Sequence, residues 1–145
     1  MSPFSLRPIL RTRSLTVWVL TAVWASLITN TSYLRGFLTL AHSLQRVQTQ
    51  YPLIALYTDT LPADGIVALH ARNIPCHPVP LIRPKCGRTY KTDARFNDTW
   101  TKLVAFSLVE YERVVLLDSD MVVLRNMDEL MDLELDDPAL NGDGA

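Results

Sequence analysis

The sequence predicts an α/β fold with a mainly parallel sheet flanked by helices. Segments with the periodicity of strands and of helices alternate along the chain, and such β-α-β units join parallel strands. The clearest strands are apolar without interruption, as expected when both faces of a sheet are covered. The 145 residues are 48% hydrophobic and 20% charged, a composition typical of one globular domain.

The first β-α unit covers residues 24–48. Apolar residues alternate in "WASLIT" and predict a strand at 24–29. "NTS" then offers a helix N-cap at Asn30 or Thr31. A helix is predicted from Ser32 to Gln48, because apolar residues recur there at helical spacing.

The next elements are a strand at 52–58, a short helix at 62–73 and a third strand at 76–82. Asn73 is a possible cap at the end of the helix. Prolines interrupt the third strand, which is therefore expected at the edge of the sheet.

A polar loop is predicted at 83–98, followed by a helix that Asp98 or Thr99 caps and that reaches Tyr111. A strand at 113–117 then leads into "DSD", a second apolar piece at 121–124 and a helical turn within "NMDELMDL". The predicted domain spans residues 23–137, and residues 138–145 are predicted to be a disordered tail.

The amino-terminal residues 1–22 are predicted to be a poorly structured leader. Three arginines precede the apolar run 15–28, as in a signal peptide or signal anchor. The run is shorter than the ~20 residues that span a bilayer, and its later part alternates like a strand. We therefore expect no membrane insertion and a cytoplasmic location. The alternative is a Golgi or secretory location with residues 1–28 as a signal anchor.

Charge is distributed unevenly. Residues 1–109 carry twelve basic and four acidic residues, whereas residues 110–145 carry two basic and eleven acidic ones. The acidic end argues against a nucleic-acid partner there. It also favours a cation near Asp118 and Asp120. The later acidic residues are expected to form a solvated surface; they are Asp132, Glu134, Asp136 and Asp137.

Asp118 and Asp120 follow the most hydrophobic strand. Side chains at i and i+2 of a strand project to one side, so the two carboxylates are expected to share a divalent cation. Hard oxygen ligands suit Mg²⁺ or Mn²⁺. "VVLLDSDMV" also resembles the haloacid-dehalogenase phosphatase signature, in which Asp118 would be the nucleophile and Asp120 the general acid. That family opens with this strand, whereas four β/α elements precede it here, so the phosphatase hypothesis ranks lower.

Other candidate residues are ambiguous from spacing alone. Asn30 would read a base edge and Tyr33 would stack on it, or Asn30 is a plain N-cap beside a half-buried tyrosine. Lys102, on the helix before the aspartates, is a ligand or a solvated lysine. Arg95 is a phosphate clamp or a surface charge.

Three blocks together resemble glycosyltransferase family 8, the group of glycogenin and galactinol synthase, and most closely its fungal galactinol-synthase-like members. They are "SLITNTSYLRGFLTLAHSL" (26–44), "PLIALYTD" (52–59) and "RFNDTWTKLVAFSLVEYERVVLLDSDMVVLRNMDEL" (95–130). The last block is specific, because helix, lysine, strand and D-x-D motif match in order.

The resemblance implies a GT-A fold, a Rossmann-like sheet that binds a nucleotide sugar, usually UDP-linked. It implies retaining transfer of a hexose to a hydroxyl acceptor, which is a sugar, a polyol or a protein. Asp118 and Asp120 would bind Mn²⁺ (or Mg²⁺), and Lys102 would contact the donor. The other implied donor contacts are Leu27, Thr29, Asn30, Tyr33, Ser119 and, more loosely, Arg95.

Two departures from the family follow from the same comparison. Residues 1–22 have no counterpart in its cytosolic members. The chain ends soon after the D-x-D strand, before the segment in which the family supplies a histidine ligand and the acceptor site. We therefore expect a donor-binding half with little activity alone. A non-catalytic degenerate domain is the remaining alternative.

Overall fold

The computed structural model describes residues 22–83 and 99–134. Their four strands form one parallel sheet in the order β3-β2-β1-β4. The strands are β1 (Ala22–Ile28), β2 (Leu53–Tyr57), β3 (Cys76–Pro78) and β4 (Arg113–Leu116). The helices are α1 (Leu34–Arg46) and α2 (Ala63–His70), with 3₁₀-helices η1 (Thr31–Tyr33), η2 (Trp100–Ser107) and η3 (Asp128–Met131). The predicted α/β class with a parallel sheet is confirmed.

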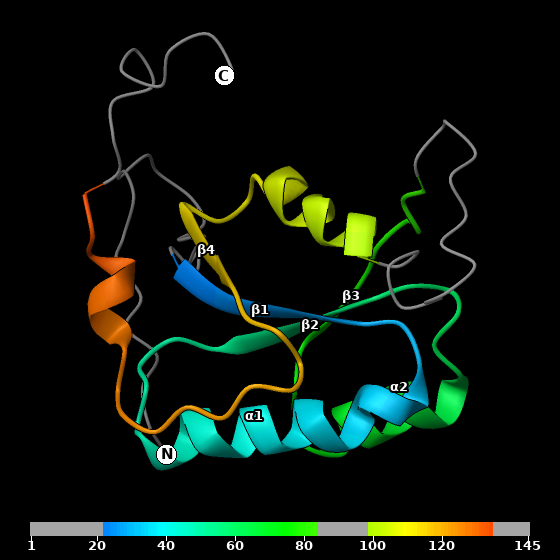
Figure 1. Ribbon diagram of the computed structural model, residues 1–145, viewed down its shortest axis with the longest axis horizontal. Coiled ribbons are helices and arrows are strands. Elements are labelled where there is room, and N and C mark those ends of the chain that lie inside the picture. Colours follow the sequence, from blue (N-terminus) through cyan, green and yellow to red (C-terminus); the bar gives the residue numbers. More distant parts are fainter. Residues whose placement is uncertain (1–21, 84–98, 135–145) are drawn as a thin grey trace, which may run out of the picture.

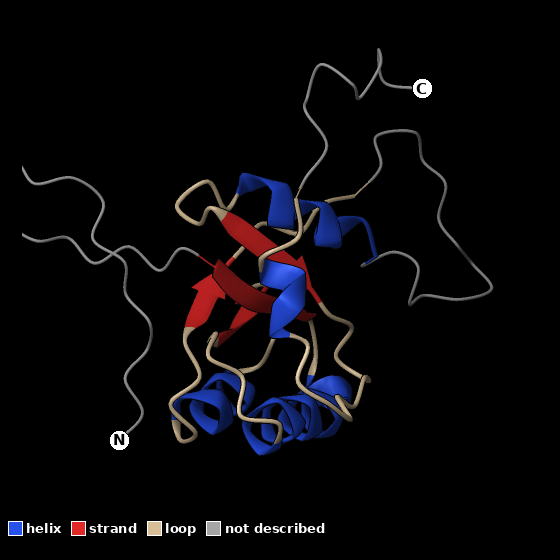
Figure 2. Cartoon of the chain, turned by 90° about the vertical axis from the view of Figure 1, so that its left-hand side faces the viewer, coloured by secondary structure: helices blue, strands red, loops and turns tan. Residues whose placement is uncertain are grey.

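The elements form three layers (Figures 1 and 2). The helices α1 and α2 lie on one face of the sheet, and η2 lies on the other. The central strand β1 is buried on both faces. Val23 and Ala25 pack on the η2 side, and Trp24 and Ile28 pack on the side of α1. The strand predicted at 24–29 is therefore confirmed, with bounds 22–28. Its burial on both faces was not predicted, because alternation is typical of a strand buried on one face.

The edge position predicted for the third strand is confirmed, but the strand is shorter than the predicted 76–82. It ends at Pro78. The Val79 amide still donates to the Tyr57 carbonyl at 2.8 Å. Pairing ends here because Tyr57, the last residue paired with the third strand, is also the last residue of β2.

Two helix predictions need correction. The segment before β4 is a 3₁₀-helix at Trp100–Ser107, not an α-helix that reaches Tyr111. The first helix begins as η1 and becomes α-helical only from Leu34 to Arg46, inside the predicted 32–48. Asn30 caps it as predicted: its side-chain oxygen accepts a hydrogen bond from the Ser32 amide at 3.0 Å.

The predicted leader and tail lie outside the described residues, apart from Ala22, which opens β1. None of the helices in the described ranges has the length and apolar character needed to cross a membrane. Asp132 and Glu134 are exposed, as the solvated-surface interpretation predicts.

The segment 119–128 runs beside α1 in the same direction as the helix (Figure 1). Midway, the Val123 amide donates to the Ser43 hydroxyl at 3.0 Å in a buried position. At the far end, the Asn126 side chain donates to the Val47 carbonyl at 3.1 Å. These bonds fix the chain after β4 to the helix along the helix's length.

Asp128 closes this arrangement at the carboxyl end of α1. Its carboxylate accepts a hydrogen bond from the Thr49 hydroxyl and one from the Gln50 amide at 2.9 Å. Thr49 in turn accepts from the buried indole of Trp24 at 2.9 Å. A polar network thus joins η3, the loop after α1 and the central strand.

We predict that Asp128→Ala lowers the free energy of unfolding by about 1–3 kcal/mol, because partly buried donors lose their acceptor. The matched control is Glu129→Ala, which removes an acid next to it whose exposed pair with Arg125 spans 3.6 Å. This control is expected to change stability by less than about 0.5 kcal/mol. Urea denaturation of the two variants measures the difference, and equal effects would contradict the network's role.

Candidate functional site

The two aspartates lie in a turn at the carboxyl end of β4. The strand ends at Leu116, and the Leu117 amide still bonds to the Ala25 carbonyl at 2.8 Å. The Met121 amide then donates to the Asp118 carbonyl at 3.1 Å, which closes a turn over residues 118–121. The prediction that alternation in a strand places both carboxylates on one side is therefore wrong. A turn, rather than a strand, presents them.

Gly36 of α1 allows this turn to lie directly on the helix. A Cβ atom at position 36 would be 2.6 Å from the Ser119 carbonyl oxygen and 3.4 Å from the Asp120 Cα. The first of these distances is closer than non-bonded atoms approach, so only glycine fits here. Sequence reasoning missed this residue. The contact spans more than eighty positions, and a glycine inside a helical pattern was the only signal for it.

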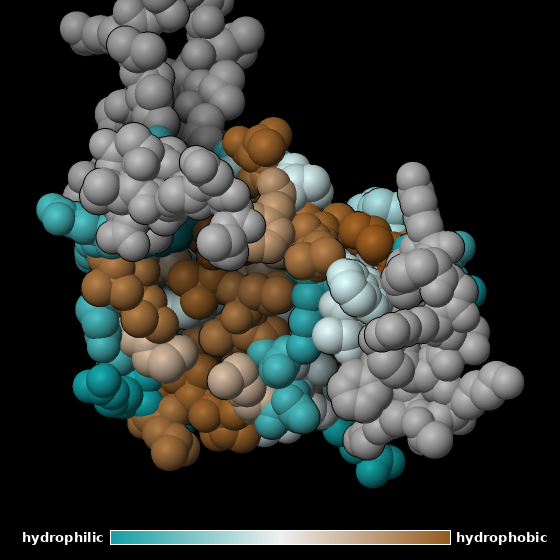
Figure 3. Space-filling model, turned by 45° about the horizontal axis from the view of Figure 1, so that its top comes forward, coloured by the Kyte–Doolittle hydropathy of each residue, from teal (hydrophilic) through white to brown (hydrophobic). Residues whose placement is uncertain are grey.

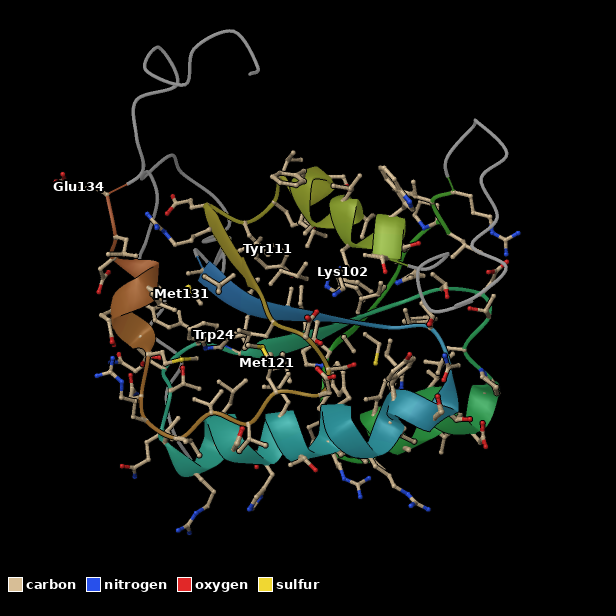
Figure 4. The ribbon with its side chains drawn as sticks, viewed as in Figure 1. Trp24, Lys102, Tyr111, Met121, Met131 and Glu134 are labelled. Atoms are coloured by element: carbon tan, nitrogen blue, oxygen red, sulfur yellow. The ribbon has the colours of Figure 1, made fainter. Side chains whose placement is uncertain are left out.

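Lys102 and Asp118 meet at this turn. The Lys102 ammonium donates a hydrogen bond to the Asp118 carboxylate, although sixteen positions separate the two residues. Figure 4 shows Lys102 extending from η2 towards the sheet. The side chains remain 37% and 54% exposed. An ion pair so open to solvent contributes little stability.

The loop after β1 lies at the same end of the sheet. Thr29 is buried, and its carbonyl accepts a hydrogen bond from the Thr60 hydroxyl at 2.8 Å. The carboxamide of Asn30 caps η1, and Tyr33 is half-buried against the core beside α2. These positions match the alternative in which Asn30 is a plain N-cap and Tyr33 is a half-buried tyrosine beside it. Leu27 is also half-buried, on the η2 side of the sheet.

Thr60 is a second residue that sequence reasoning missed. Its hydroxyl also lies 2.6 Å from that of Thr58, a fully buried residue that follows β2. These hydrogen bonds join the ends of β1 and β2 and hold the loop that carries Asn30. The sequence "YTDT" offered only polar residues after a strand.

Hard oxygen donors are present at the turn. Asp118 and Asp120 are both exposed and accessible to a cation. Within residues 22–83 and 99–134, no three His, Cys, Asp or Glu side chains group closely enough to hold a metal ion. Two carboxylates suit part of the shell of Mn²⁺ or Mg²⁺, which commonly takes its other ligands from water and substrate phosphates. Arg95 lies outside the described residues.

An apolar groove adjoins Lys102. It has a volume of about 410 Å³ and lies between the end of η2 and β4. Phe106 and Val109 line it and are 86% and 88% exposed. Figure 3 shows apolar side chains gathered on the side of the molecule that carries η2. The turn is therefore bordered by α1 on one side and by an apolar surface on the other.

A family model described as "Glycosyl transferase family 8" matches residues 25–142. The chain belongs to this family. The match includes β1, the loop with Asn30, Lys102 and both aspartates. Membership in glycosyltransferase family 8 favours the transferase interpretation of Asp118 and Asp120 over the phosphatase one.

Curated relatives agree with this assignment. Over 101 residues the chain is 29% identical to galactinol synthase 3 of Arabidopsis thaliana, covering 70% of the chain and 30% of that protein. Over 99 residues it is 31% identical to UDP-glucuronate:xylan alpha-glucuronosyltransferase 2 of the same plant, covering 68% and 16%. An uncharacterised protein of Acanthamoeba polyphaga mimivirus, R707, is 30% identical over 104 residues, covering 72% and 37%. The matched part of the chain thus covers less than two fifths of the length of each of these relatives.

We predict that Gly36→Ala destabilises this family 8 chain by roughly 1–3 kcal/mol, because the new methyl group overlaps the backbone of the turn. Alanine alone would favour the helix by about 0.5–1 kcal/mol, so the expected sign is opposite to that of helix propensity. Chemical denaturation measures the change. His42→Ala, at an exposed position of the same helix, is the control, expected within about 0.5 kcal/mol of wild type. A neutral or stabilising Gly36→Ala would show that the turn does not pack on α1.

Proposed function

We propose that this chain forms the donor-binding part of a glycosyltransferase that transfers a hexosyl group from a UDP-sugar to a hydroxyl acceptor, with retention and with Mn²⁺. One observation carries the proposal. In a family 8 chain, the Lys102 ammonium contacts the Asp118 carboxylate at the end of the sheet where the loop after β1 also lies. Ligands of open α/β sheets bind outside the carboxyl ends of the strands.

The names of two relatives support the reaction class. One is a galactinol synthase and one is an alpha-glucuronosyltransferase that uses UDP-glucuronate. The second name states transfer of a glucuronosyl group and a UDP-linked donor. We infer the same donor class for this chain.

Two parts of the chain contact the donor in this proposal: the loop after β1 and the D-x-D turn. The uridine is held by four residues of β1 and the loop and helix start after it: Leu27, Thr29, Asn30 and Tyr33. The Thr60 hydrogen bond and the Asn30 cap keep this loop in place. The amide of Asn30 suits the polar edge of a base, and the ring of Tyr33 suits its flat face. In the D-x-D turn, Ser119, the residue between Asp118 and Asp120, also contacts the donor in this proposal.

Lys102 has one partner in the absence of a donor and another when a donor is bound. Without a donor, its ammonium holds the Asp118 carboxylate. With a donor bound, the same ammonium neutralises charge on the diphosphate as the bond to the sugar breaks. Mn²⁺ on Asp118 and Asp120 would act as a Lewis acid that stabilises the departing UDP. The hydroxyl acceptor is a sugar, a polyol or a protein.

We expect the full 145-residue chain to bind UDP together with Mn²⁺, and Asp120→Asn to weaken that binding by at least about tenfold. Titration calorimetry measures both affinities. Asp132→Asn removes the same charge from an exposed position and is expected to bind like wild type. Equal affinities for wild type and Asp120→Asn, or no binding by either, would reject the site.

Lys102→Met separates the two contacts of the lysine. Free Mn²⁺ no longer competes with the ammonium for Asp118, so its affinity is expected to rise by up to about fivefold, the value of an exposed ion pair. The affinity for UDP with Mn²⁺ is expected to fall, because a phosphate contact is lost. Electron paramagnetic resonance of unbound Mn²⁺ measures the first, and calorimetry measures the second. If Lys102→Met weakens both to the same degree, the lysine only shapes the turn.

A further inference from the structure

A second pocket lies at the opposite end of the sheet from the aspartates. Its walls are the end of α1, the loop that leads into β2 and the segment between α2 and β3. Its volume of about 580 Å³ is in the range of small-molecule sites. Leu53, the first residue of β2, lines it, whereas the D-x-D turn follows the last residue of β4. A ligand here would not touch the proposed donor site.

Two residues with strained backbone line this pocket, and they are the non-glycine residues with positive φ in the described part of the chain. Gln48 and Asn73 both have φ of 56°. Each follows a helix that ends in the same hydrogen-bond pattern. The Gln48 and Thr49 amides bond to the carbonyls of Gln45 and Leu44.

The end of α2 repeats the pattern: the Asn73 and Ile74 amides bond to the carbonyls of His70 and Leu69. Glycine is the usual residue at this position, because a Cβ costs free energy in the left-handed conformation. Gln48 and Asn73 each carry a carboxamide there, in the wall of one pocket.

The pocket is lined by groups that suit a neutral, polyhydroxylated ligand. Four of its lining residues carry side-chain amides, and each amide offers both donors and an acceptor: Gln45, Gln48, Gln50 and Asn73. Sugar hydroxyls have the same dual character.

Leu53, Ile74 and Tyr51 add apolar surface for the C–H face of a sugar ring. Among the described residues that line the pocket, none is acidic and the one cation is Arg72, whose guanidinium donates to the Ala68 carbonyl at 3.1 Å. This lining favours neither a metal ion nor a strongly anionic ligand.

We propose that this pocket is a binding site for a neutral carbohydrate, held by the carboxamides of Gln48 and Asn73. Such a site would keep a sugar chain on the protein at a distance from the reacting end. The proposal does not depend on the proposed donor site, because the two sites share no residue.

The test is an NMR titration of the full chain with neutral sugars: glucose, maltose and cellobiose. We expect backbone amides of Gln48, Gln50 and Asn73 to shift, with affinity in the millimolar range typical of a few hydrogen bonds. myo-Inositol distinguishes a polyol from a ring sugar. Shifts with inositol alone, or with glucuronate alone through Arg72, would overturn the assignment to a neutral sugar.

The double variant Gln48→Gly/Asn73→Gly separates binding from folding. Glycine fits the left-handed conformation, so the melting temperature is expected to rise. Sugar affinity is expected to fall by at least about tenfold, because both carboxamides are lost. Asp120→Asn is the control and is expected to bind the sugars like wild type. Unchanged affinity in the double variant, or lost affinity in Asp120→Asn, would overturn the proposal, as would an absence of shifts in wild type.

Discussion

The close contact between α1 and the chain that follows β4 is the constraint on which the candidate site depends. The missing side chain of Gly36 allows the turn to reach the helix, and Ser43 and Asp128 then hold the segment along it. The same helix begins at Asn30, which caps it. One helical segment therefore contacts both the loop after β1 and the D-x-D turn, although about ninety positions separate Asn30 from Asp120. Precise placement on helices and strands is what a binding site requires.

Charged side chains gather at the turn that this packing positions. Asp118 and Asp120 lie in the acidic part of the chain, and Lys102 brings one positive charge to them from η2. The pair is exposed, so it adds little to stability. The apolar groove beside Lys102 borders this charged turn, with Phe106 and Val109 exposed at its edge. The exposed Lys102–Asp118 pair therefore contributes little to stability and brings one ammonium group next to the D-x-D turn.

Sequence reasoning located the strands, because alternating or continuous apolar residues leave a local signal that a window of residues shows. It also placed Asn30 as a cap and the proline-containing strand at the edge. It predicted an α-helix before β4, where the structure has a 3₁₀-helix, because both leave similar spacing in a short segment. It treated the D-x-D motif as strand, since nothing local marks the end of pairing. Gly36, Thr60 and Asp128 act through partners about thirty to eighty positions away, and no local pattern reveals such contacts.

The central claim is that the turn at residues 118–121 is a cation site held between α1 and η2. Paramagnetic broadening by Mn²⁺ in NMR spectra of the full chain tests it most directly, because broadening falls steeply with distance from the bound ion. The account predicts that the backbone amides of Gly36, Lys102 and Ser119 broaden first, while those of Gln48 and Asn73 stay sharp. Broadening that is uniform, or that centres on Asp132 and Glu134, would contradict it.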